Sequence, residues 1–221
     1  MASQPERVEY GDHPSQFCEL LAAGDDVAVL IHGGFWRARY GRDLEHPIAR
    51  DLVGRGWTVW NVEYRRLGDG GGWPATFDDV KAALEAIPMR AARVVAIGHS
   101  AGGQLAAWAA GRVPLSGVVS QAGALDLYGL WRLGTSGHVV RQLLGGSPEE
   151  VPERYEAASP RPPAGMPLLL VHGALDEDVP VSMSRGFATG RDCDLVVIED
   201  EGHYEHLEPG SKCWRAVTEW L

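Results

Sequence analysis

Short runs of consecutive apolar residues recur along the chain and alternate with stretches in which apolar residues return every three or four positions. The runs predict strands, and the periodic stretches predict amphipathic helices. Strands are expected at 27–31, 58–62, 93–97, 115–120, 168–171 and 195–198. This alternation is the βαβ pattern of a parallel sheet, and uninterrupted apolar runs suit strands that helices cover on both faces.

Periodic stretches between these runs predict the helices. Leu44, Ile48 and Leu52 recur every four residues and predict a helix that ends near the glycines at 54 and 56. The other expected helices run between Pro74 and Pro88, from 103 to about 110, and over the last residues of the chain, where Ser211 can cap the first turn.

The expected fold class is therefore α/β, with a mostly parallel sheet of about six to eight strands and helices on both faces. Residues 1–221 are expected to form one domain. Few extra strands are expected before residue 27, where the first clear strand begins. The least regular stretch, 121–166, holds glycines, prolines and aromatic residues. Two interpretations of it stay open, a small cap over the site or a helix with surface loops.

Charge and composition narrow the class of protein. Asp and Glu number 30 against 20 Lys and Arg, which gives a net charge of −10. This acidic balance argues against nucleic acid or an anionic membrane as a partner. Three cysteines without Cys-x-x-Cys spacing argue against a disulfide scaffold or a structural zinc site. A polar N-terminus and the lack of a long apolar run predict a cytoplasmic protein that acts on a small molecule, with a homodimer left open.

A Gly-x-Ser-x-Gly motif stands at one junction between a predicted strand and a predicted helix. Residues 98–102 read Gly-His-Ser-Ala-Gly and directly follow the strand expected at 93–97. A serine in such a sharp turn is exposed at the end of a sheet with a helix N-terminus behind it, which favours a nucleophile over an ordinary turn serine. Ser100 then needs a base, an acid that orients the base, and backbone donors for the oxyanion.

Later strand ends supply an acid and a histidine. Asp176 follows the last strand but one, and His203 follows the last strand. The order Ser, Asp, His is the one expected where functional side chains gather beyond the carboxyl ends of the strands. Asp178 competes with Asp176 as the acid. His206, interpreted as a surface histidine, competes with His203.

Two glycines follow the first strand, in the sequence His-Gly-Gly-Phe-Trp at 32–36. They let backbone N–H groups turn toward a substrate oxygen. By position, the amides of Gly34 and Phe35, with that of Ala101, are expected to form the oxyanion hole. Candidates to line the substrate pocket, against the plainer interpretation of packing, are Trp36, Tyr64, His99 and Tyr204.

Acids and histidines also gather after the last strand, at 199–206. No second ligand cluster with suitable spacing accompanies them, so no metal or other cofactor is expected, and the acids are interpreted as a solvated loop. His32 and His172 each stand at the end of a strand. They are expected to hold loop geometry through hydrogen bonds.

These motifs, in this order, resemble the α/β-hydrolase superfamily over roughly residues 27–221. The stretch before Trp36 and the serine motif are most similar to the esterase and arylformamidase (kynurenine formamidase-like) branch. The loop around Asp176 also resembles that of prolyl-oligopeptidase-type domains. Phe35 stands where lipase-like members have a third glycine, which favours the formamidase-like branch.

The resemblance implies an α/β-hydrolase fold with little or no cap domain. It also implies a serine hydrolase that cleaves a small carboxylic ester or an N-formyl aryl amide through Ser100, His203 and Asp176. Two alternatives stay open, an exopeptidase or amidase and a non-catalytic homologue that binds a small molecule.

Overall fold

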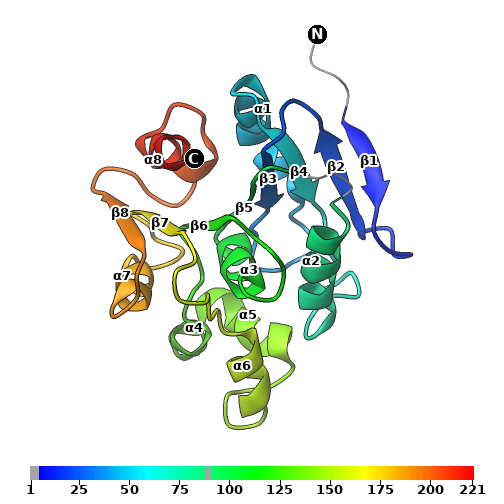
Figure 1. Cartoon of the computed structure of the whole chain (residues 1–221). Helices are drawn as coiled ribbons and strands as arrows, with labels where there is room; N and C mark the ends of the chain where they lie inside the picture. The colour runs from blue at the N-terminus through cyan, green and yellow to red at the C-terminus, as the bar shows by residue number, and fades with distance from the viewer. Residues whose placement is uncertain (1–4, 88–90) are drawn as a thin grey trace.

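The computed structural model describes residues 5–87 and 91–221, whose strands form an eight-stranded sheet in the order β1-β2-β4-β3-β5-β6-β7-β8 (Figure 1). The strands are β1 (Glu6–Glu9), β2 (Phe17–Leu21), β3 (Val27–Ile31), β4 (Thr58–Val62), β5 (Val94–His99), β6 (Gly117–Gln121), β7 (Leu168–Gly173) and β8 (Asp194–Ile198). The pairings of β2 with β1 and β4 are antiparallel, and the remaining pairings are parallel. The predicted mostly parallel α/β sheet is confirmed.

Helices cover both faces of this sheet. They are α1 (His46–Gly54), α2 (Ala75–Glu85), α3 (Ala101–Ala109), α4 (Leu127–Leu133), α5 (Thr135–Leu144), α6 (Pro152–Ala158), α7 (Ser182–Ala188) and α8 (Lys212–Trp220), with the 3₁₀ helices η1 (Arg42–Glu45) and η2 (Glu205–Leu207). In Figure 1, α1 and α8 lie on one face, and α2, α3 and α7 lie on the other. Among the described residues, no helix combines the length and apolar character needed to cross a bilayer.

The structure agrees with the predicted boundaries of two helices where it describes them. The helix expected between Pro74 and Pro88 is α2, and Pro88 itself lies outside the described residues. The predicted cap of the last helix is confirmed, because the Ser211 hydroxyl accepts a hydrogen bond from the Trp214 N–H at 2.9 Å.

Each central strand sends alternate side chains into two apolar layers. In β3, Val27, Val29 and Ile31 pack in the layer under α2 and α3, whereas Ala28 and Leu30 pack in the layer under α1 and α8. All five side chains are fully buried. Burying one large aliphatic side chain stabilises the fold by about 1.5–3 kcal/mol. A strand covered on both faces needs apolar residues at every position, which is why its sequence shows no alternation.

The apolar pattern did not predict the two strands at the N-terminal edge. The strand β1 reads Glu-Arg-Val-Glu, and only Val8 is partly buried. The strand β2 lies between β1 and β4, and its buried residues, Phe17, Cys18 and Glu19, include a charged one and so form no apolar run. The edge strand β1 has one neighbour, so it needs no apolar run. The cysteines at 18, 193 and 213 are all free.

Three helices, α4, α5 and α6, occupy the irregular stretch 121–166. In Figure 1 they lie beyond α3, on the side of the molecule away from α1 and α8. Their apolar sides bury Leu127, Leu130, Val140 and Leu143 in the same layer as α3. The stretch is therefore a small helical insertion packed onto the core, and it contains more helix than the sequence predicted.

Candidate active site

Ser100 occupies the tight turn between β5 and α3. Its φ of 54° and ψ of −116° lie in a region that residues with a Cβ rarely adopt. The Ser100 N–H donates to the Gln121 carbonyl at 2.8 Å, and the Ser100 carbonyl accepts from the Ala124 N–H at 3.1 Å. A Cβ at Gly102 would collide with the Ile31 carbonyl oxygen, so the start of α3 requires glycine there. The turn holds Ser100 at the carboxyl end of β5 and the N-terminus of α3.

The loops after β7 and β8 bring Asp176 and His203 into direct contact. His203 Nδ1 lies 2.6 Å from Asp176 Oδ2, and the two side chains are 5% and 0% exposed. The other carboxylate oxygen, Oδ1, accepts from the N–H groups of Asp178 at 2.9 Å and Val179 at 2.7 Å. Asp178, the alternative acid, instead accepts from the Tyr204 hydroxyl at 2.8 Å. The backbone therefore orients the Asp176 carboxylate so that Oδ2 faces the imidazole.

His172 forms the other side of the acid site. Its Nε2 lies 3.1 Å from Asp176 Oδ2 and 2.9 Å from the Val179 carbonyl oxygen, and its Nδ1 lies 2.7 Å from Ser184 Oγ. Because both neighbours of Nε2 are acceptors, Nε2 bears a hydrogen. Burial alone would raise the pKa of Asp176, but hydrogen bonds from His172 and His203 outweigh burial and hold that pKa below its usual range. The predicted role of His172 in loop geometry is confirmed.

Two more buried histidines pack beside His203. The His99 Nε2–H donates to the His203 carbonyl at 2.8 Å, and the two ring centroids are 4.6 Å apart. His206 was predicted at the surface, and that prediction is wrong. It is fully buried, with its ring centroid 5.9 Å from that of His99. The 3₁₀ helix η2 turns it inward, where Gln121 Nε2 donates to its carbonyl at 3.1 Å. The His203 ring therefore lies against His99, the residue that directly precedes Ser100, although no hydrogen bond joins the Ser100 hydroxyl to His203 within residues 5–87 and 91–221.

Burial keeps the imidazoles of His99 and His206 neutral. Desolvation and the neighbouring His203 lower the pKa of His99 to about 3. Desolvation and the neighbouring His99 likewise lower the pKa of His206. An ordinary histidine titrates near pH 6.5. Neither ring therefore brings a positive charge to the site at neutral pH.

Two of the three predicted oxyanion amides, those of Gly34 and Phe35, lie in a strained loop after β3, and the third, that of Ala101, begins α3. Gly34, Phe35 and Trp36 all have positive φ, at 102°, 56° and 53°. Two consecutive non-glycine residues in this region cost on the order of 1–3 kcal/mol each, which is typical of a functional constraint. Within residues 5–87 and 91–221, no backbone carbonyl accepts a hydrogen bond from the N–H of Gly34, Phe35 or Ala101.

A buried charged cluster supports this loop from behind. His32 Nδ1 lies 2.7 Å from the Gly33 carbonyl oxygen, and His32 Nε2 lies 3.1 Å from Glu63 Oε1. Arg66 and Arg42 contact the same carboxylate at 3.0 Å and 3.7 Å. Burial alone would raise the pKa of Glu63, but the hydrogen bond from His32 and the positive charges around the carboxylate hold that pKa low. The predicted structural role of His32 is confirmed.

A small cavity lies beside Ser100, with a volume of about 10 Å³. That is room for about one water molecule. Its lining residues are Phe35, Trp36, Ser100, Ala101, Ala124, Leu130, Val139 and Val179. Apart from the Ser100 hydroxyl and the Trp36 indole N–H, the lining side chains are apolar. The cavity is therefore an apolar space next to the serine.

The four residues expected to line the substrate pocket lie in different environments in the structure. Trp36 lines the cavity. Tyr64 does not, because its fully buried ring stacks on His32 at 4.4 Å and its hydroxyl donates to the His32 carbonyl at 2.8 Å. The pocket role expected for Tyr64 is therefore unsupported. His99 lies beneath His203, and Tyr204 is 59% exposed at the surface. The aromatic pattern alone could not separate core from pocket.

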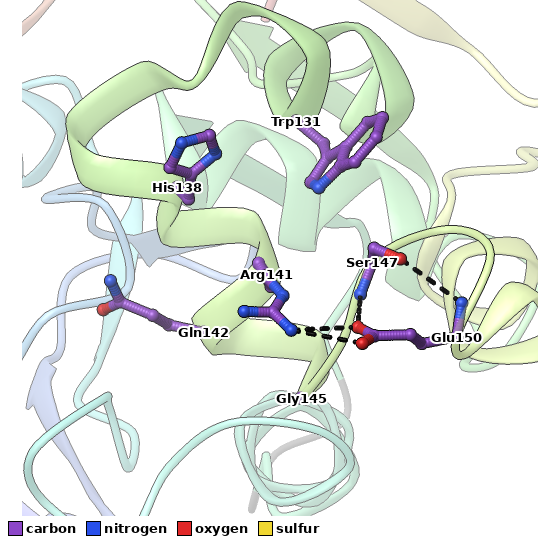
Figure 2. Close-up of a pocket in the computed structure, with 7 residues that line it drawn as sticks. All are labelled: Trp131, His138, Arg141, Gln142, Gly145, Ser147 and Glu150. Atoms are coloured by element: carbon purple, nitrogen blue, oxygen red, sulfur yellow. Dashed lines mark hydrogen bonds and ion pairs between the residues drawn. The ribbon is translucent and has the colours of Figure 1, made fainter.

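A larger hollow, of about 780 Å³, lies against α5 (Figure 2). Its lining residues are Trp131, His138, Arg141, Gln142, Gly145, Ser147 and Glu150. In Figure 2, Arg141 reaches across to Glu150, and the two side chains pair at 3.1 Å. None of the expected catalytic residues lines this hollow. Of these two spaces, the smaller cavity is the one that Ser100 lines.

The sheet order and the strained serine between β5 and α3 define an α/β-hydrolase fold. The chain belongs to the prolyl oligopeptidase family, whose model matches residues 54–221. It is thus a serine hydrolase of the α/β-hydrolase type. No curated protein matches the chain in sequence.

Solved structures of esterases share this fold. A truncated carbohydrate esterase from gut microbiota superposes with a TM-score of 0.83 at 18% identity, over 99% of this chain and 95% of that one. A bifunctional GH43-CE protein of Bacteroides eggerthii gives 0.83 at 18% identity, and the match spans 100% of this chain but only 38% of the longer one. Esterase Est2 of Thermogutta terrifontis gives 0.74 at 22% identity, over 98% and 89% of the two chains. At these identities the likeness shows the fold.

Proposed function

We propose that this protein cleaves small carboxylic esters, or N-formyl aryl amides, through a triad of Ser100, His203 and Asp176. The observation that supports this most is the 2.6 Å contact between His203 Nδ1 and the buried Asp176 Oδ2. A carboxylate bonded to Nδ1–H leaves Nε2 as the acceptor, which is the tautomer that a general base needs. The packing of the His203 ring on His99, next to Ser100, further supports the assignment.

In the proposed reaction, Ser100 Oγ attacks the acyl carbon while His203 Nε2 takes the hydroxyl proton. The carbonyl oxygen becomes an oxyanion, and the amides of Ala101 and of the loop after β3 donate hydrogen bonds to it. As the bond to the leaving group breaks, His203 returns the proton to the departing alcohol or amine. Water then attacks the acyl-enzyme, gives a proton to His203, and releases the carboxylic acid as Ser100 regains its proton. Asp176 stabilises the imidazolium in both halves.

The cavity beside the serine favours small substrates over peptides. It has room for about one water molecule, which is far smaller than most amino-acid side chains. The names of the structural relatives, which are esterases, also support an ester substrate. The family match supports an exopeptidase as the second candidate.

A substrate panel tests the proposal. The panel holds p-nitrophenyl acetate, N-formylkynurenine and a dipeptide p-nitroanilide, each assayed with the unchanged protein and with Ser100→Ala. We expect turnover of the ester or the formamide, and a loss of kcat by about 10⁴ to 10⁶ in the variant, with an unchanged circular dichroism spectrum. Turnover of the anilide alone would favour the peptidase. A folded variant that keeps full activity would overturn the triad.

A further inference from the structure

The cavity beside Ser100 takes its walls from segments far apart in the chain. Trp36 comes from the loop after β3, Leu130 from α4, Val139 from α5, and Val179 from the loop after β7. Each of these four side chains is at least nine-tenths buried. The space they leave next to the serine is that of about one water molecule.

We propose that this cavity is the acyl site, and that it admits acyl groups of one or two carbons, formyl and acetyl, while excluding longer chains. Leu130 and Val139 set this limit. The inference rests on the proposed function and narrows its substrate class from small acyl groups in general to the two smallest. It makes these two side chains specificity-determining residues.

The walls cannot easily move aside for a longer chain. Leu130, Val139 and Val179 belong to the same continuous apolar layer that packs against the sheet. Such layers have near-crystalline packing density, so forcing extra methylenes into them displaces side chains and backbone at a substantial energetic cost. A methyl group fits within the space of one water, whereas a propyl group does not.

The helices that bear the two limiting residues are themselves anchored. The carboxylate of Asp126 caps α4 by accepting from the Gly129 N–H at 2.9 Å. The Leu143 carbonyl near the end of α5 accepts from the Trp73 N–H at 2.7 Å. The insertion between β6 and β7 therefore presents a fixed wall to the serine.

One residue of the cavity wall, Val179, also holds Asp176 in place. Val179 lines the cavity with its side chain, while its N–H donates to Asp176 Oδ1 at 2.7 Å. An acyl chain that pushes on Val179 therefore disturbs the hydrogen bond that orients the carboxylate. For this reason we expect long acyl chains to lower kcat as well as to raise KM.

The test compares p-nitrophenyl acetate, butyrate and hexanoate by kcat/KM. With the unchanged protein we expect kcat/KM to fall at least about tenfold from acetate to butyrate, since misfit by a methylene in an apolar pocket is worth about 10- to 200-fold. Leu130→Ala and Val139→Ala should each raise the ratio of butyrate to acetate by about tenfold or more. Leu133→Ala is the matched control, because Leu133 lies on α4 but is 62% exposed. It should leave the ratio unchanged.

The outcomes separate this inference from the proposed function. Equal kcat/KM for all three esters, or folded Leu130→Ala and Val139→Ala proteins that keep the original ratio, would overturn the acyl-site inference and leave the triad intact. Complete lack of ester and formamide turnover, with no labelling of Ser100 by a fluorophosphonate, would overturn both. Val139→Ala removes less buried surface than Leu130→Ala, so it decides the question if the larger truncation unfolds.

Discussion

Two buried carboxylates, Glu63 and Asp176, each contact a histidine at the end of a strand, yet the rest of their surroundings differ. Glu63 also contacts the guanidinium groups of Arg66 and Arg42. Asp176 contacts two imidazoles and two backbone N–H groups. In the described part of the chain, no arginine or lysine pairs with Asp176.

Under the proposed function, this difference separates a structural carboxylate, Glu63, from a reactive one, Asp176. Arginine is charged at every accessible pH, so the negative charge of Glu63 is permanently balanced. The charge of Asp176 faces imidazoles instead, whose own charge can change during a reaction. Its negative potential is therefore available to stabilise an imidazolium that forms at His203. The comparison teaches that the partners of a buried acid, more than its burial, decide its role.

The largest expected effect comes from neutralising Asp176, the proposed acid of the triad. Asp176→Asn should lower kcat by about 10⁴, because the amide neither selects the right tautomer of His203 nor stabilises its charge. The matched control is Asp178→Asn, which alters the neighbouring acid whose carboxylate accepts from the Tyr204 hydroxyl. It should change kcat by less than about tenfold, as expected for a partly exposed hydrogen bond. Steady-state kinetics on one ester checks both, and similar losses in both variants would contradict the assignment.

Removing the structural carboxylate should act on stability. Glu63→Gln removes the buried carboxylate that pairs with Arg66 and Arg42, and leaves them with Asp69 at 3.4 Å and Glu19 at 2.8 Å. Removing one partner of a buried ion pair costs about 3–5 kcal/mol. Urea denaturation at pH 7 measures the loss. A stability within about 1 kcal/mol of the unchanged protein would show that this carboxylate is not needed by the network, since that is the range of ordinary surface pairs.

The buried His206 should make the stability of the folded protein sensitive to acid. The folded state holds His206 neutral, with its pKa lowered by burial, whereas the unfolded chain protonates it below about pH 6.5. The unfolded state then binds more protons, so this residue lowers stability as pH falls below 6.5, by up to about 1.4 kcal/mol per pH unit. His206→Phe should remove that dependence. Urea denaturation at pH 7, 6 and 5 checks it, and an unchanged slope would contradict the neutral state of His206.

A buried acid, Glu45, should respond with the opposite sign. Burial raises the pKa of Glu45, the last residue of η1, to about 8. Its folded state therefore keeps a proton that the unfolded chain releases above about pH 4.5, and stability falls as pH rises from about 5 to 8. Glu45→Gln mimics the protonated form and should flatten this decline. If Glu45→Gln and His206→Phe shift the pH dependence of stability in the same direction, the contrast between these two residues fails.

The smallest expected effect comes from changing the exposed residue Tyr204. Tyr204 is largely exposed, and its hydroxyl bonds to Asp178. Tyr204→Phe should therefore change stability by less than about 1 kcal/mol. The same variant should change kcat/KM on a short ester by less than about threefold. A larger loss of kcat/KM would indicate that Tyr204 contacts the substrate.

Much of this fold could be predicted from apolar runs, because the central strands are covered on both faces. The runs at 27–31 and 58–62 match β3 and β4 residue for residue. The polar edge strand β1 could not be found, because backbone hydrogen bonds to β2 stabilise it and no apolar run marks it. The short helix α7, which no predicted element covered, likewise depends on packing against β7 and β8.

Within the site, local sequence signals were informative only where a motif encodes a backbone shape. The turn around Ser100 is such a motif, because its small neighbours permit an unusual φ. The burial of His206 was not predicted, since its environment comes from His99, more than a hundred positions away in the chain. Tyr64 shows the same limit, because its partner His32 belongs to another strand end.

Labelling with a fluorophosphonate probe, mapped by peptide mass spectrometry, measures directly whether Ser100 is an activated nucleophile. The probe reacts with a serine only when a base activates it. The account predicts rapid modification of Ser100 in the unchanged protein, none in Ser100→Ala, and modification slowed by at least about 10²-fold in Asp176→Asn. A folded, unchanged protein that stays unlabelled, or a label found on another residue at the same rate in Ser100→Ala, would contradict it.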